Sequence, residues 1–519
     1  FTFKLMRIAI RTDASQNIGS GHVMRCLAFA EELRNRGAII EFITREHQGN
    51  LNKQINNKGF KVHLLITQTK QLKNNLTGYE KLLGVRQSID ADQTIQVLIE
   101  SEWDWIIVDH YALDYCWERK LKSYSKKIMV IDDLANRKHD CDILLDQNYI
   151  NNKCRYDHLL SFSTIKLLGP KYALIRKDFS ENKKNKGVNK ISKVFVFFGG
   201  TDVSNLTQMT IRALSRSELR HLLVDVVIGS ANPCKSELKI EADKHSNVKI
   251  YIQIDDMARL MSEADIAIGG GGVTTWERMT LGLPSLVVTL ADNQVASIKD
   301  LNRDGYIAWI GDINTVNEQL IYNAFLKVIK NISQLKVQSY NCYSLVKGLG
   351  SKIVSDFLIN GPVLEEIFIR KAEISDALLY WHWVNDPEVR KNAFNQNTIE
   401  WKEHAIWFEK YLNSHDTILL LAECDLGPIG QVRFDCSGVH CKVDFSLAKQ
   451  FRGFGLGKKI LEKSILYLSK EHFFTLVAEV KNNNISSIKT FEKLGFVKSR
   501  SQSSQKDTCI YKLEQRMEA

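Results

Sequence analysis

A histidine behind a glycine-rich turn is the first residue of the chain whose type and setting suit catalysis. The turn Gly19-Ser20-Gly21-His22 follows an apolar run that leads into Asp13. Ligands bind beyond the carboxyl ends of the strands in an open α/β sheet, so this turn is expected to face a ligand. An imidazole titrates near neutral pH and can take a proton from water or a hydroxyl. His22 is therefore a candidate general base that Asp13 could orient; the alternatives are a helix cap or a phosphate ligand.

Polar side chains also follow three later strand candidates. They are Asp109-His110-Tyr111, Asp132-Asp133 and Gln147-Asn148. Polar clusters at consecutive strand ends are what a sugar-binding wall requires. Each of them taken alone is more often a helix cap or a loop anchor.

Two further glycine-rich turns stand in the middle of the chain, each between a strand candidate and a helix candidate. They are Gly199-Gly200-Thr201-Asp202 and the run from Gly269 to Gly272, and Glu277 and Asn293 lie downstream. Glycine lets the backbone approach an anion, and a helix N-terminus supplies unpaired N–H groups. This set suits a nucleoside diphosphate. A nicotinamide cofactor is disfavoured, since no G-x-G-x-x-G fingerprint follows either opening strand.

A last glycine-rich turn, Arg452-Gly453-Phe454-Gly455-Leu456-Gly457-Lys458, lies between a strand candidate and a helix candidate. Successive backbone N–H groups in such a turn form a nest for a pyrophosphate. The alternative is an incidental turn. The pattern Asn484-x-x-Ser487-x-x-x-Phe491 follows at a spacing that favours the first interpretation.

Short β-rich runs alternate with amphipathic stretches in the first two thirds of the chain, which predicts two Rossmann-like domains facing a cleft. Several runs are apolar throughout, as in parallel strands covered on both faces. The strands expected in the first domain are Arg7–Arg11, Ile39–Ile43, Trp105–His110, Ile128–Asp132 and Ile143–Asp146. Those of the second are Val194–Phe198, Leu222–Ile228, Val248–Ile252, Ile266–Gly269 and Ser285–Leu290, and a single helical stretch, Tyr340–Leu358, follows them.

The order of elements changes after Asn360-Gly361-Pro362, where strands occur in a run before the last glycine turn, as in an α+β domain. The expected boundaries are 6–180 and 191–358 for the two Rossmann-like domains, with the lysine-rich connector Glu181–Lys193 between them, and 365–515 for the α+β domain. The expected strands of this last domain are Ile367–Arg370, Ile418–Glu423, Ile429–Asp435, Cys441–Leu447 and Thr475–Lys481, and the expected helices are Ser375–Val384, Thr398–Leu412, Lys458–Ser469 and Ile485–Leu494.

Composition limits the class of protein. The 519 residues are 44% hydrophobic and 25% charged, which excludes a disordered chain, and the net charge of +10 is too small to indicate nucleic acid binding. Neither an apolar run of about 20 residues nor a signal-peptide pattern is present, so we expect no membrane insertion and a cytoplasmic location. Ten cysteines without zinc-type spacing indicate scattered buried thiols and no metal, in preference to disulfides.

The stretch Arg7–Leu27 resembles the opening of the UDP-sugar hydrolase family of pseudaminic acid biosynthesis, and the resemblance extends over about residues 6–358. It implies a two-domain glycosyltransferase-B arrangement. It also implies that water attacks the anomeric carbon of UDP-2,4-diacetamido-2,4,6-trideoxy-β-L-altropyranose and releases UDP with inversion. His22 would be the base. The residues implied to hold the UDP are Gly200, Thr201, Gly271, Glu277 and Asn293, and the UDP-sugar-binding set also includes Gly21, Asp109, His110, Tyr111 and Gly272.

The last glycine turn and the Asn484 pattern together resemble the GNAT acetyltransferase family over about residues 365–515. The resemblance implies acetyl-CoA as co-substrate and direct attack of an amine on the thioester. The residues implied to bind acetyl-CoA are Leu447, Arg452, Gly453, Gly455, Gly457, Lys458, Asn484 and Ser487. Phe491 stands where many members have a tyrosine that protonates the leaving thiolate, so the general acid stays open.

These resemblances imply a bifunctional enzyme that acts on a UDP-linked amino sugar with acetyl-CoA and water. The C-terminal domain would acetylate the 4-amino UDP-sugar precursor, and the two Rossmann-like domains would release UDP from the product. The alternatives are a UDP-sugar glycosyltransferase with a fused acetyltransferase, and a nucleotide-sugar-binding protein without catalysis.

Overall fold

In the computed structural model the chain divides into an N-terminal unit, Phe1–Ser161 with Lys166–Ile359, and a C-terminal unit, Phe162–Ile165 with Asn360–Ala519. The structure describes residues 5–67, 76–152, 154–183, 190–230, 232–254, 256–362, 366–469, 474–499 and 507–514. Outside this set lie residues 1–4, residues 184–189 in the middle of the expected connector, and positions 365 and 515. The boundaries of the three expected domains stay a prediction.

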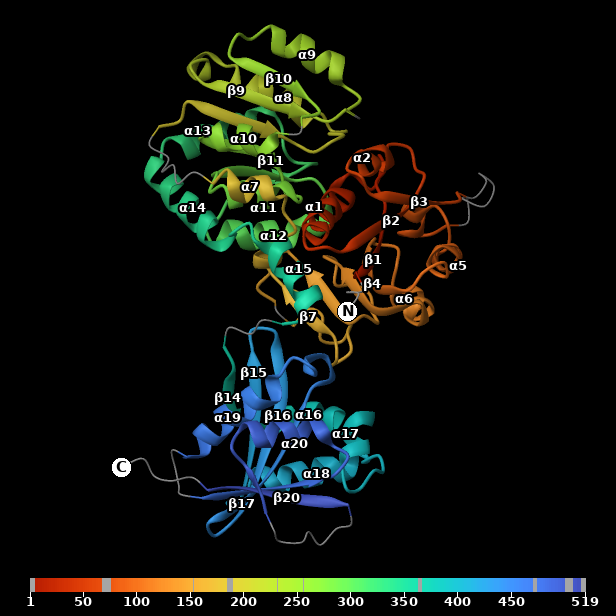
Figure 1. Cartoon of the computed structure of the whole chain (residues 1–519). Coiled ribbons are helices and arrows are strands. Elements are labelled where there is room, and N and C mark those ends of the chain that lie inside the picture. Colours follow the sequence, from red (N-terminus) through yellow and green to blue (C-terminus); the bar gives the residue numbers. More distant parts are fainter. Residues whose placement is uncertain are drawn as a thin grey trace. The chain divides into compact units, whose positions relative to one another are not determined.

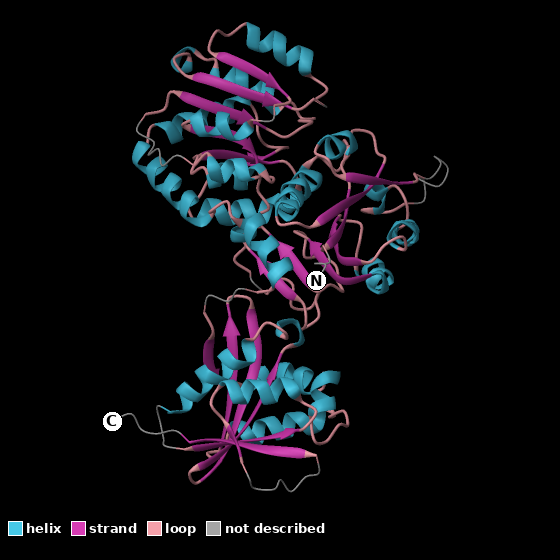
Figure 2. Ribbon diagram, viewed as in Figure 1, coloured by secondary structure: helices cyan, strands magenta, loops and turns pink. Residues whose placement is uncertain are grey.

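The N-terminal unit begins with a seven-stranded sheet in the order β3-β2-β1-β4-β5-β6-β7 (Figure 1). The strands pair in parallel from β3 through β6, and helices cover the sheet (Figure 2). The strands are β1 Arg7–Thr12, β2 Ile39–Arg45, β3 Lys61–Leu65, β4 Trp103–Asp109, β5 Ser125–Ile131, β6 Ile143–Asp146 and β7 Ile165–Leu168. The helices are α1 Gly21–Asn35, α2 Asn52–Asn57, α4 Glu80–Leu83, α5 Gln87–Leu98, α6 Tyr115–Leu121 and α7 Lys177–Glu181.

A second parallel sheet follows, in the order β10-β9-β8-β11-β12-β13. In both sheets the first strand is central and the chain winds outward from it on each side, which is the Rossmann order. The strands are β8 Lys193–Phe197, β9 Leu223–Ile228, β10 Val248–Ile252, β11 Ile266–Gly270, β12 Ser285–Thr289 and β13 Ala308–Asp312. The helices are α8 Leu206–Leu214, α9 Lys235–Asp243, α10 Met257–Glu263, α11 Thr274–Thr280, α12 Asp292–Arg303, α13 Glu318–Ile329, α14 Ile332–Leu345 and α15 Gly350–Asn360.

The helical stretch expected over Tyr340–Leu358 is divided between two helices. Helix α14 ends at Leu345 and α15 begins at Gly350. Gly348 between them has φ 71°, a left-handed conformation that glycine adopts readily and that ends an α-helix.

The C-terminal unit contains one mixed sheet in the order β14-β15-β16-β17-β18-β20-β19. Its pairs are antiparallel except β17 with β18, so the prediction of an α+β domain is confirmed. The strands are β14 Phe368–Lys371, β15 Thr417–Cys424, β16 Gly427–Ser437, β17 His440–Leu447, β18 Thr475–Lys481, β19 Val497–Lys498 and β20 Thr508–Glu514. The helices are α16 Ala377–Val384, α17 Pro387–Asn392, α18 Trp401–Leu412, α19 Leu456–Ser469 and α20 Ile485–Lys493.

One pair of cysteines contradicts the expectation of scattered free thiols. Cys436 and Cys441 form a disulfide, because the β16–β17 hairpin places them directly opposite each other, with their Cα atoms 4.0 Å apart. The prediction that the thiols are buried is also wrong for Cys116 and Cys154, which are exposed. The spacing of the cysteines in the sequence does not show which residues face each other across a hairpin, so this disulfide was not predicted.

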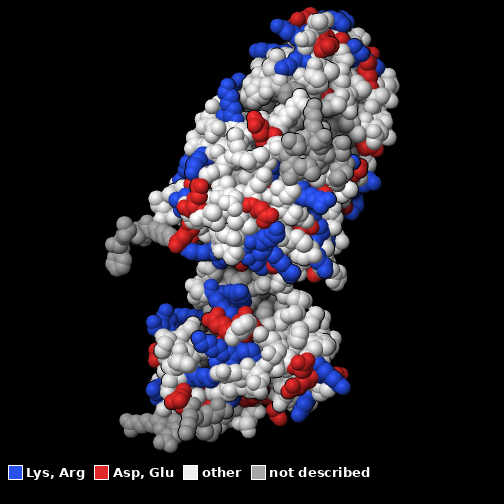
Figure 3. All heavy atoms as spheres, turned by 90° about the vertical axis from the view of Figure 1, so that its right-hand side faces the viewer, with Lys and Arg blue, Asp and Glu red and all other residues white. Residues whose placement is uncertain are grey.

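Charges of both signs are interspersed over the face of the molecule drawn in Figure 3, in keeping with the modest net charge. No helix among the described residues has the length and apolar character needed to cross a membrane.

Candidate active sites

The imidazole of His22 contacts a buried carboxylate in the N-terminal unit. His22 is the second residue of α1, and its Nδ1 lies 2.5 Å from Oδ1 of Asp109, the last residue of β4. Strands β1 and β4 are neighbours in parallel register, with Thr12 opposite Asp109. The helix that follows β1 therefore begins beside the carboxyl end of β4, and this topology brings His22 and Asp109 together.

Asp109 is held as a carboxylate by Arg25, which lies one turn after His22 on α1. The Nε and Nη2 atoms of Arg25 donate to the two oxygens of Asp109, each at 2.6 Å. Burial acts to raise the pKa of Asp109, but Arg25 and His22 outweigh it and hold that pKa well below its usual range. An ionised Asp109 accepts the Nδ1–H of His22, so Nε2 keeps its lone pair for proton transfer.

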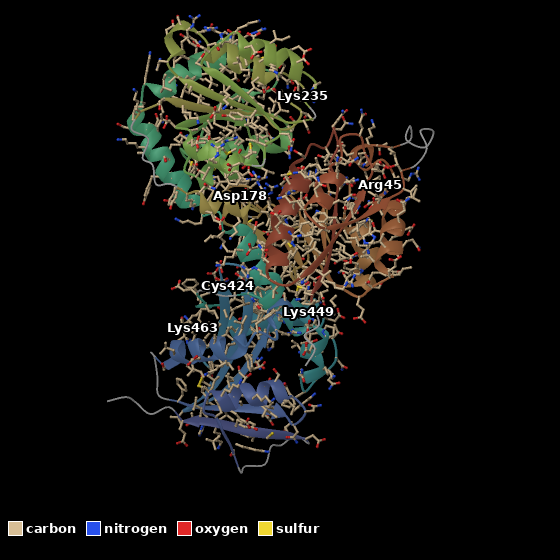
Figure 4. The ribbon with its side chains drawn as sticks, turned by 45° about the horizontal axis from the view of Figure 1, so that its top comes forward. Arg45, Asp178, Lys235, Cys424, Lys449 and Lys463 are labelled. Atoms are coloured by element: carbon tan, nitrogen blue, oxygen red, sulfur yellow. A yellow bond between two sulfur atoms is a disulfide. The ribbon has the colours of Figure 1, made fainter. Side chains whose placement is uncertain are left out.

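The expectation that Asp13 orients His22 is wrong. Nη2 of Arg11 donates to Asp13 Oδ2 at 2.8 Å, and the backbone N–H of Arg45 donates to Oδ1 at 2.7 Å. Nε2 of His47 and Nε2 of His110 each lie 3.6 Å from the same Oδ2. Asp13 is thus engaged in a buried charged network, which also includes the Arg45 side chain labelled in Figure 4. Asp109, expected to bind substrate, is the orienting carboxylate instead.

His110 belongs to this buried network. Its Nδ1 accepts a hydrogen bond from the backbone N–H of Ala112 at 3.0 Å, and its side chain is buried. Burial lowers the pKa of His110 to about 3, against the opposing charge of Asp13. His110 is therefore neutral near pH 7, and its contacts are structural, in contrast with the substrate contact expected for it.

Tyr111 connects the two parts of the N-terminal unit beside His22. The Tyr111 ring lies 4.6 Å from the His22 ring, edge to face. Its hydroxyl accepts a hydrogen bond from Asn293 Nδ2 at 2.9 Å, although 182 positions separate the two residues. Burial and the nearby Asp133 carboxylate raise the pKa of Tyr111 well above its usual range, so the hydroxyl stays protonated.

The glycine turns approach the start of α1. A β-carbon at Gly21 would lie 3.4 Å from Val273, and one at Gly200 would lie 3.6 Å from the Ser20 hydroxyl. At Gly271 a β-carbon would come within 2.9 Å of Ile298, so the close packing requires glycine there. The structure thus brings the expected residues His22, Gly21, Tyr111, Gly200 and Asn293 into one neighbourhood.

The remaining expected ligands of this region are placed as follows. A β-carbon at Gly272 would lie 3.6 Å from Gln294, an ordinary contact, and Thr201 is half-buried in the turn that leads to α8. Glu277 is buried on α11, 3.5 Å from Arg176, and burial raises its pKa in spite of that arginine. Arg25 was not predicted from the sequence, although its spacing of three residues from His22 puts both on one helix face.

The C-terminal unit contains a separate turn with the geometry of an anion nest. Gly453 and Gly455 have φ values of 87° and 72° and are exposed, and α19 begins directly after them. A β-carbon at Gly457 would lie 3.3 Å from the Phe445 ring, so glycine lets α19 pack closely on β17. Lys458 is exposed on the first turn of α19.

Strands β17 and β18 pair only over their first residues. Their partners run from His440 opposite Thr475 to Lys442 opposite Val477, while β17 stays paired with β16 as far as Leu447. The later part of β17 therefore has backbone donors and acceptors that are not used by β18. A ligand with amide groups, such as the pantetheine arm of acetyl-CoA, fits such an edge. Asn484 caps α20 by accepting from the Ser487 N–H at 3.2 Å.

Arg452 is paired with carboxylates of its own unit. Its Nη1 donates to Asp386 at 2.7 Å and to Glu388 at 3.0 Å, and its Nε donates to the Leu447 carbonyl at 3.0 Å. Nη1 and Nε of Arg452 are thus engaged within the unit, while its Nη2 has no partner among the described residues, and the expected contact of this guanidinium with a pyrophosphate stays a prediction. The backbone N–H groups of the turn are further candidates for that role.

Phe491 is buried against the rings of Phe445 and Phe496 and carries no acid. Glu479, a possible base, accepts from Lys442 Nζ at 2.9 Å. Within the part of the chain that the structure describes, no group of three or more His, Cys, Asp or Glu side chains is arranged to hold a metal ion.

Comparison with known proteins finds two domain families. Residues 193–344 match the glycosyltransferase family 28 C-terminal domain, and residues 366–497 match the acetyltransferase (GNAT) domain. Together with the sheet orders, these matches confirm the expected fold class of two Rossmann-like sheets of the glycosyltransferase type followed by a GNAT domain.

Individual proteins resemble the chain over different lengths. A protein of Methanocaldococcus jannaschii, "Uncharacterized protein MJ1062", is 27% identical over 95% of this chain and 97% of its own length. The UDP-2,4-diacetamido-2,4,6-trideoxy-beta-L-altropyranose hydrolase of Campylobacter jejuni is 26% identical over 58% of this chain and 98% of its own length. The crystal structure of Acinetobacter baumannii MurG is 15% identical, with a TM-score of 0.47 over 68% of this chain and 99% of that one. The chain thus joins a unit that is homologous to the Campylobacter hydrolase and includes a glycosyltransferase family 28 C-terminal domain to a GNAT acetyltransferase domain.

Proposed function

We propose that the N-terminal unit hydrolyses UDP-2,4-diacetamido-2,4,6-trideoxy-β-L-altropyranose to UDP and the free sugar. The observation that carries this proposal is the contact between His22 Nδ1 and Asp109, which leaves Nε2 available as a base. His22 takes a proton from water while the water oxygen bonds to the anomeric carbon with inversion. The bond from that carbon to the UDP oxygen breaks, and its electron pair leaves with the diphosphate. A diphosphate needs no protonation to leave, so a second carboxylic acid is unnecessary.

The nucleotide would be held by the glycine turns around Gly200 and Gly271, with Glu277 and Asn293. Support comes from the family 28 match over residues 193–344, the homology to the Campylobacter hydrolase, and the approach of both turns to the start of α1. Asn293 would act partly through Tyr111, whose hydroxyl it contacts.

The test is NMR of the purified protein with this UDP-sugar. Wild type should release UDP and an initially inverted sugar, and His22→Ala should lower the rate by at least about 100-fold. His221→Ala, at an exposed histidine of the same unit, is the matched control and should retain the wild-type rate. Intact substrate with wild type, or equal rates in wild type and His22→Ala, would refute the proposal.

The GNAT domain, in this proposal, transfers acetyl from acetyl-CoA to the 4-amino group of the UDP-sugar precursor. The amine nitrogen bonds to the thioester carbon, the carbon–sulfur bond breaks, and the proton that the nitrogen loses ends on the departing sulfur of CoA. The product of this reaction is the substrate of the first, which gives the fusion a chemical reason. Both substrates are metabolites of the cytoplasm, where we propose that the protein acts. CoA release in the presence of the amino sugar, and none without it, is the expected result.

The family 28 match favours a second candidate, transfer of the sugar to an acceptor hydroxyl in place of water. Both reactions would use His22 as the base. A disaccharide or glycolipid product formed in preference to the free sugar would establish the transferase. Binding of UDP-sugars without any turnover would favour a protein that only binds them.

A further inference from the structure

Asp133 contacts Arg25, one turn after His22 on α1, and has one carboxylate oxygen without a partner among the described residues. It follows β5 by two positions, and its side chain is 11% exposed. Oδ2 accepts from Arg25 Nη1 at 3.3 Å. Oδ1 is buried and has no hydrogen-bond partner among the described residues. Leaving a buried carboxylate oxygen unpaired costs free energy, so its retention requires a reason.

Two neighbours of Asp133 also belong to the surroundings of His22. Arg25 gives its Nε and Nη2 to Asp109, so it cannot turn to Oδ1 without releasing the carboxylate that orients His22. The Tyr111 hydroxyl accepts from Asn293, and its own proton is hydrogen-bonded to the Asp133 carboxylate, which together with burial raises the pKa of Tyr111. A third neighbour, Arg155, donates from Nη2 to the backbone carbonyl of Asp133, and its Nε has no partner among the described residues.

The preceding residue shows what a structural aspartate looks like in this fold. Oδ1 of Asp132 accepts from Arg137 at 2.7 Å, and its Oδ2 accepts from the Ala135 N–H at 2.9 Å and the Tyr156 hydroxyl at 3.0 Å. Both oxygens of Asp132 are satisfied within the protein. Oδ1 of Asp133 has no such partner at hydrogen-bond distance among the described residues, so it is available to a donor of a bound ligand.

We propose that Asp133 is a specificity-determining residue whose Oδ1 accepts a hydrogen bond from an O–H or acetamido N–H of the sugar beside His22. This inference rests on the proposed function, since it takes a UDP-linked sugar as the ligand. The negative charge strengthens the bond and selects sugars that present a donor at that position. Sugars without this donor would leave the carboxylate unpaired and bind less tightly.

Asp133→Asn tests the proposal because the shape of the side chain is kept. Arg25 Nη1 is a donor, so it holds the amide oxygen, and the amide NH₂ takes the place of Oδ1. A donor then faces the donor of the sugar. We expect kcat/KM for the UDP-sugar to fall by about 10- to 100-fold. The affinity for UDP alone and the Tm should stay at the wild-type values, with Asp92→Asn at an exposed site as the matched control.

Two sugar analogues identify the donor, one lacking the hydroxyl and one lacking an acetamido N–H. The penalty of Asp133→Asn should vanish for one of them. Equal kcat/KM in wild type and variant, a lowered Tm with weaker UDP binding, or a penalty that persists with both analogues would overturn the proposal. If wild type releases no UDP, the proposed hydrolysis fails, and Asp133 is judged by calorimetric affinities. Weaker binding of the UDP-sugar but not of UDP would then support its role, and equal affinities would refute it.

Discussion

At the scale of single residues, the chemistry proposed for the N-terminal unit depends on which carboxylate contacts which histidine. Asp109 has both oxygens engaged by His22 and Arg25, so the proposed mechanism makes it a positioning residue. Asp13 lies instead near two other histidines, His47 and His110, in the buried network. The two aspartates are therefore distinguishable by experiment.

Asp109→Asn should lower kcat by about 100- to 10,000-fold, because an amide can donate to Nδ1 and stabilise the wrong tautomer of His22. Asp13→Asn should leave the kcat of the folded protein within about threefold of wild type, while it lowers the Tm through loss of the Arg11 pair. Steady-state kinetics with thermal unfolding of both variants checks this. A larger kcat loss in Asp13→Asn than in Asp109→Asn would contradict the assignment.

Asp146, at the end of β6, predicts a pH effect on stability. Burial raises the pKa of this carboxyl to about 7, against the opposing charge of Arg155. Between about pH 4, where the unfolded carboxyl titrates, and about pH 7, the folded protein binds the proton and the unfolded chain does not. Stability from this group therefore falls as the pH rises through that window.

Asp146→Asn removes this dependence, since the amide is neutral at every pH. We therefore compare the unfolding free energy of the variant with that of wild type at each pH. Between pH 5 and pH 8 this difference should shift in favour of the variant by on the order of 1–3 kcal/mol. Urea unfolding of both proteins at the two pH values measures the difference. An identical pH dependence of the unfolding free energy in the two proteins would show that the carboxyl is ionised throughout.

At the scale of elements, the last glycine turn and the strands beside it form the proposed acetyl-CoA site. Gly455 has φ 72°, and a β-carbon there would meet no atom within 4 Å. Backbone conformation, not space, therefore requires glycine. Gly438, in the β16–β17 hairpin, also has a positive φ, 59°, and a β-carbon there would also meet no atom within 4 Å. It lies outside the last glycine turn and therefore serves as a control.

Gly455→Val and Gly438→Val should each cost about 1–2 kcal/mol of stability, the penalty for a left-handed side-chain residue. Only Gly455→Val should also weaken acetyl-CoA binding, by at least about tenfold, because the N–H groups of the nest are displaced. Isothermal titration calorimetry with acetyl-CoA compares the two. Equal losses of affinity would mean that the turn has no special role.

Most elements that surround the sites could be predicted from the sequence, because their apolar runs are long or strictly alternating. Strands β6, β10 and β18 have the predicted bounds. Strand β3, with sequence KVHLL and only one fully buried residue, and β13, half-buried throughout, were missed because edge strands lack a clear apolar signal.

The site residues divide in the same way. His22 and the glycine turns were found because local spacing and resemblance mark them. The partner of His22 was not, since it depends on β1 and β4 being neighbours in register, a fact of topology. Asp386 and Glu388, which hold Arg452, are a comparable case: 64 or more positions separate them from it.

At the scale of the whole molecule, each unit contains its own set of site residues. His22, Asp109, Tyr111 and Asn293 belong to the N-terminal unit, while the glycine turn and β17 belong to the C-terminal unit. The two chemistries should therefore be separable by mutation in the intact chain.

His22→Ala should lower the rate of UDP release by at least about 100-fold and leave acetyl transfer at the wild-type rate, while Gly455→Val should impair acetyl transfer and leave UDP release at the wild-type rate. Both activities are measured on the same full-length preparations, one by NMR of the sugar and one by thiol release. Loss of both activities in either variant, with the protein folded, would show that the units depend on each other.

The early end of the β17–β18 pairing has a consequence for the protein without its co-substrate. Amide protons after Lys442 that face β18 have no strand to bond to, so they should exchange with solvent deuterium quickly. Bound acetyl-CoA would act as a substitute strand segment and slow this exchange. At a concentration 100 times its Kd it would add about 2.7 kcal/mol to the stability of the folded state. If acetyl-CoA completes the sheet in this way, folding and acetyl-CoA binding are parts of one equilibrium.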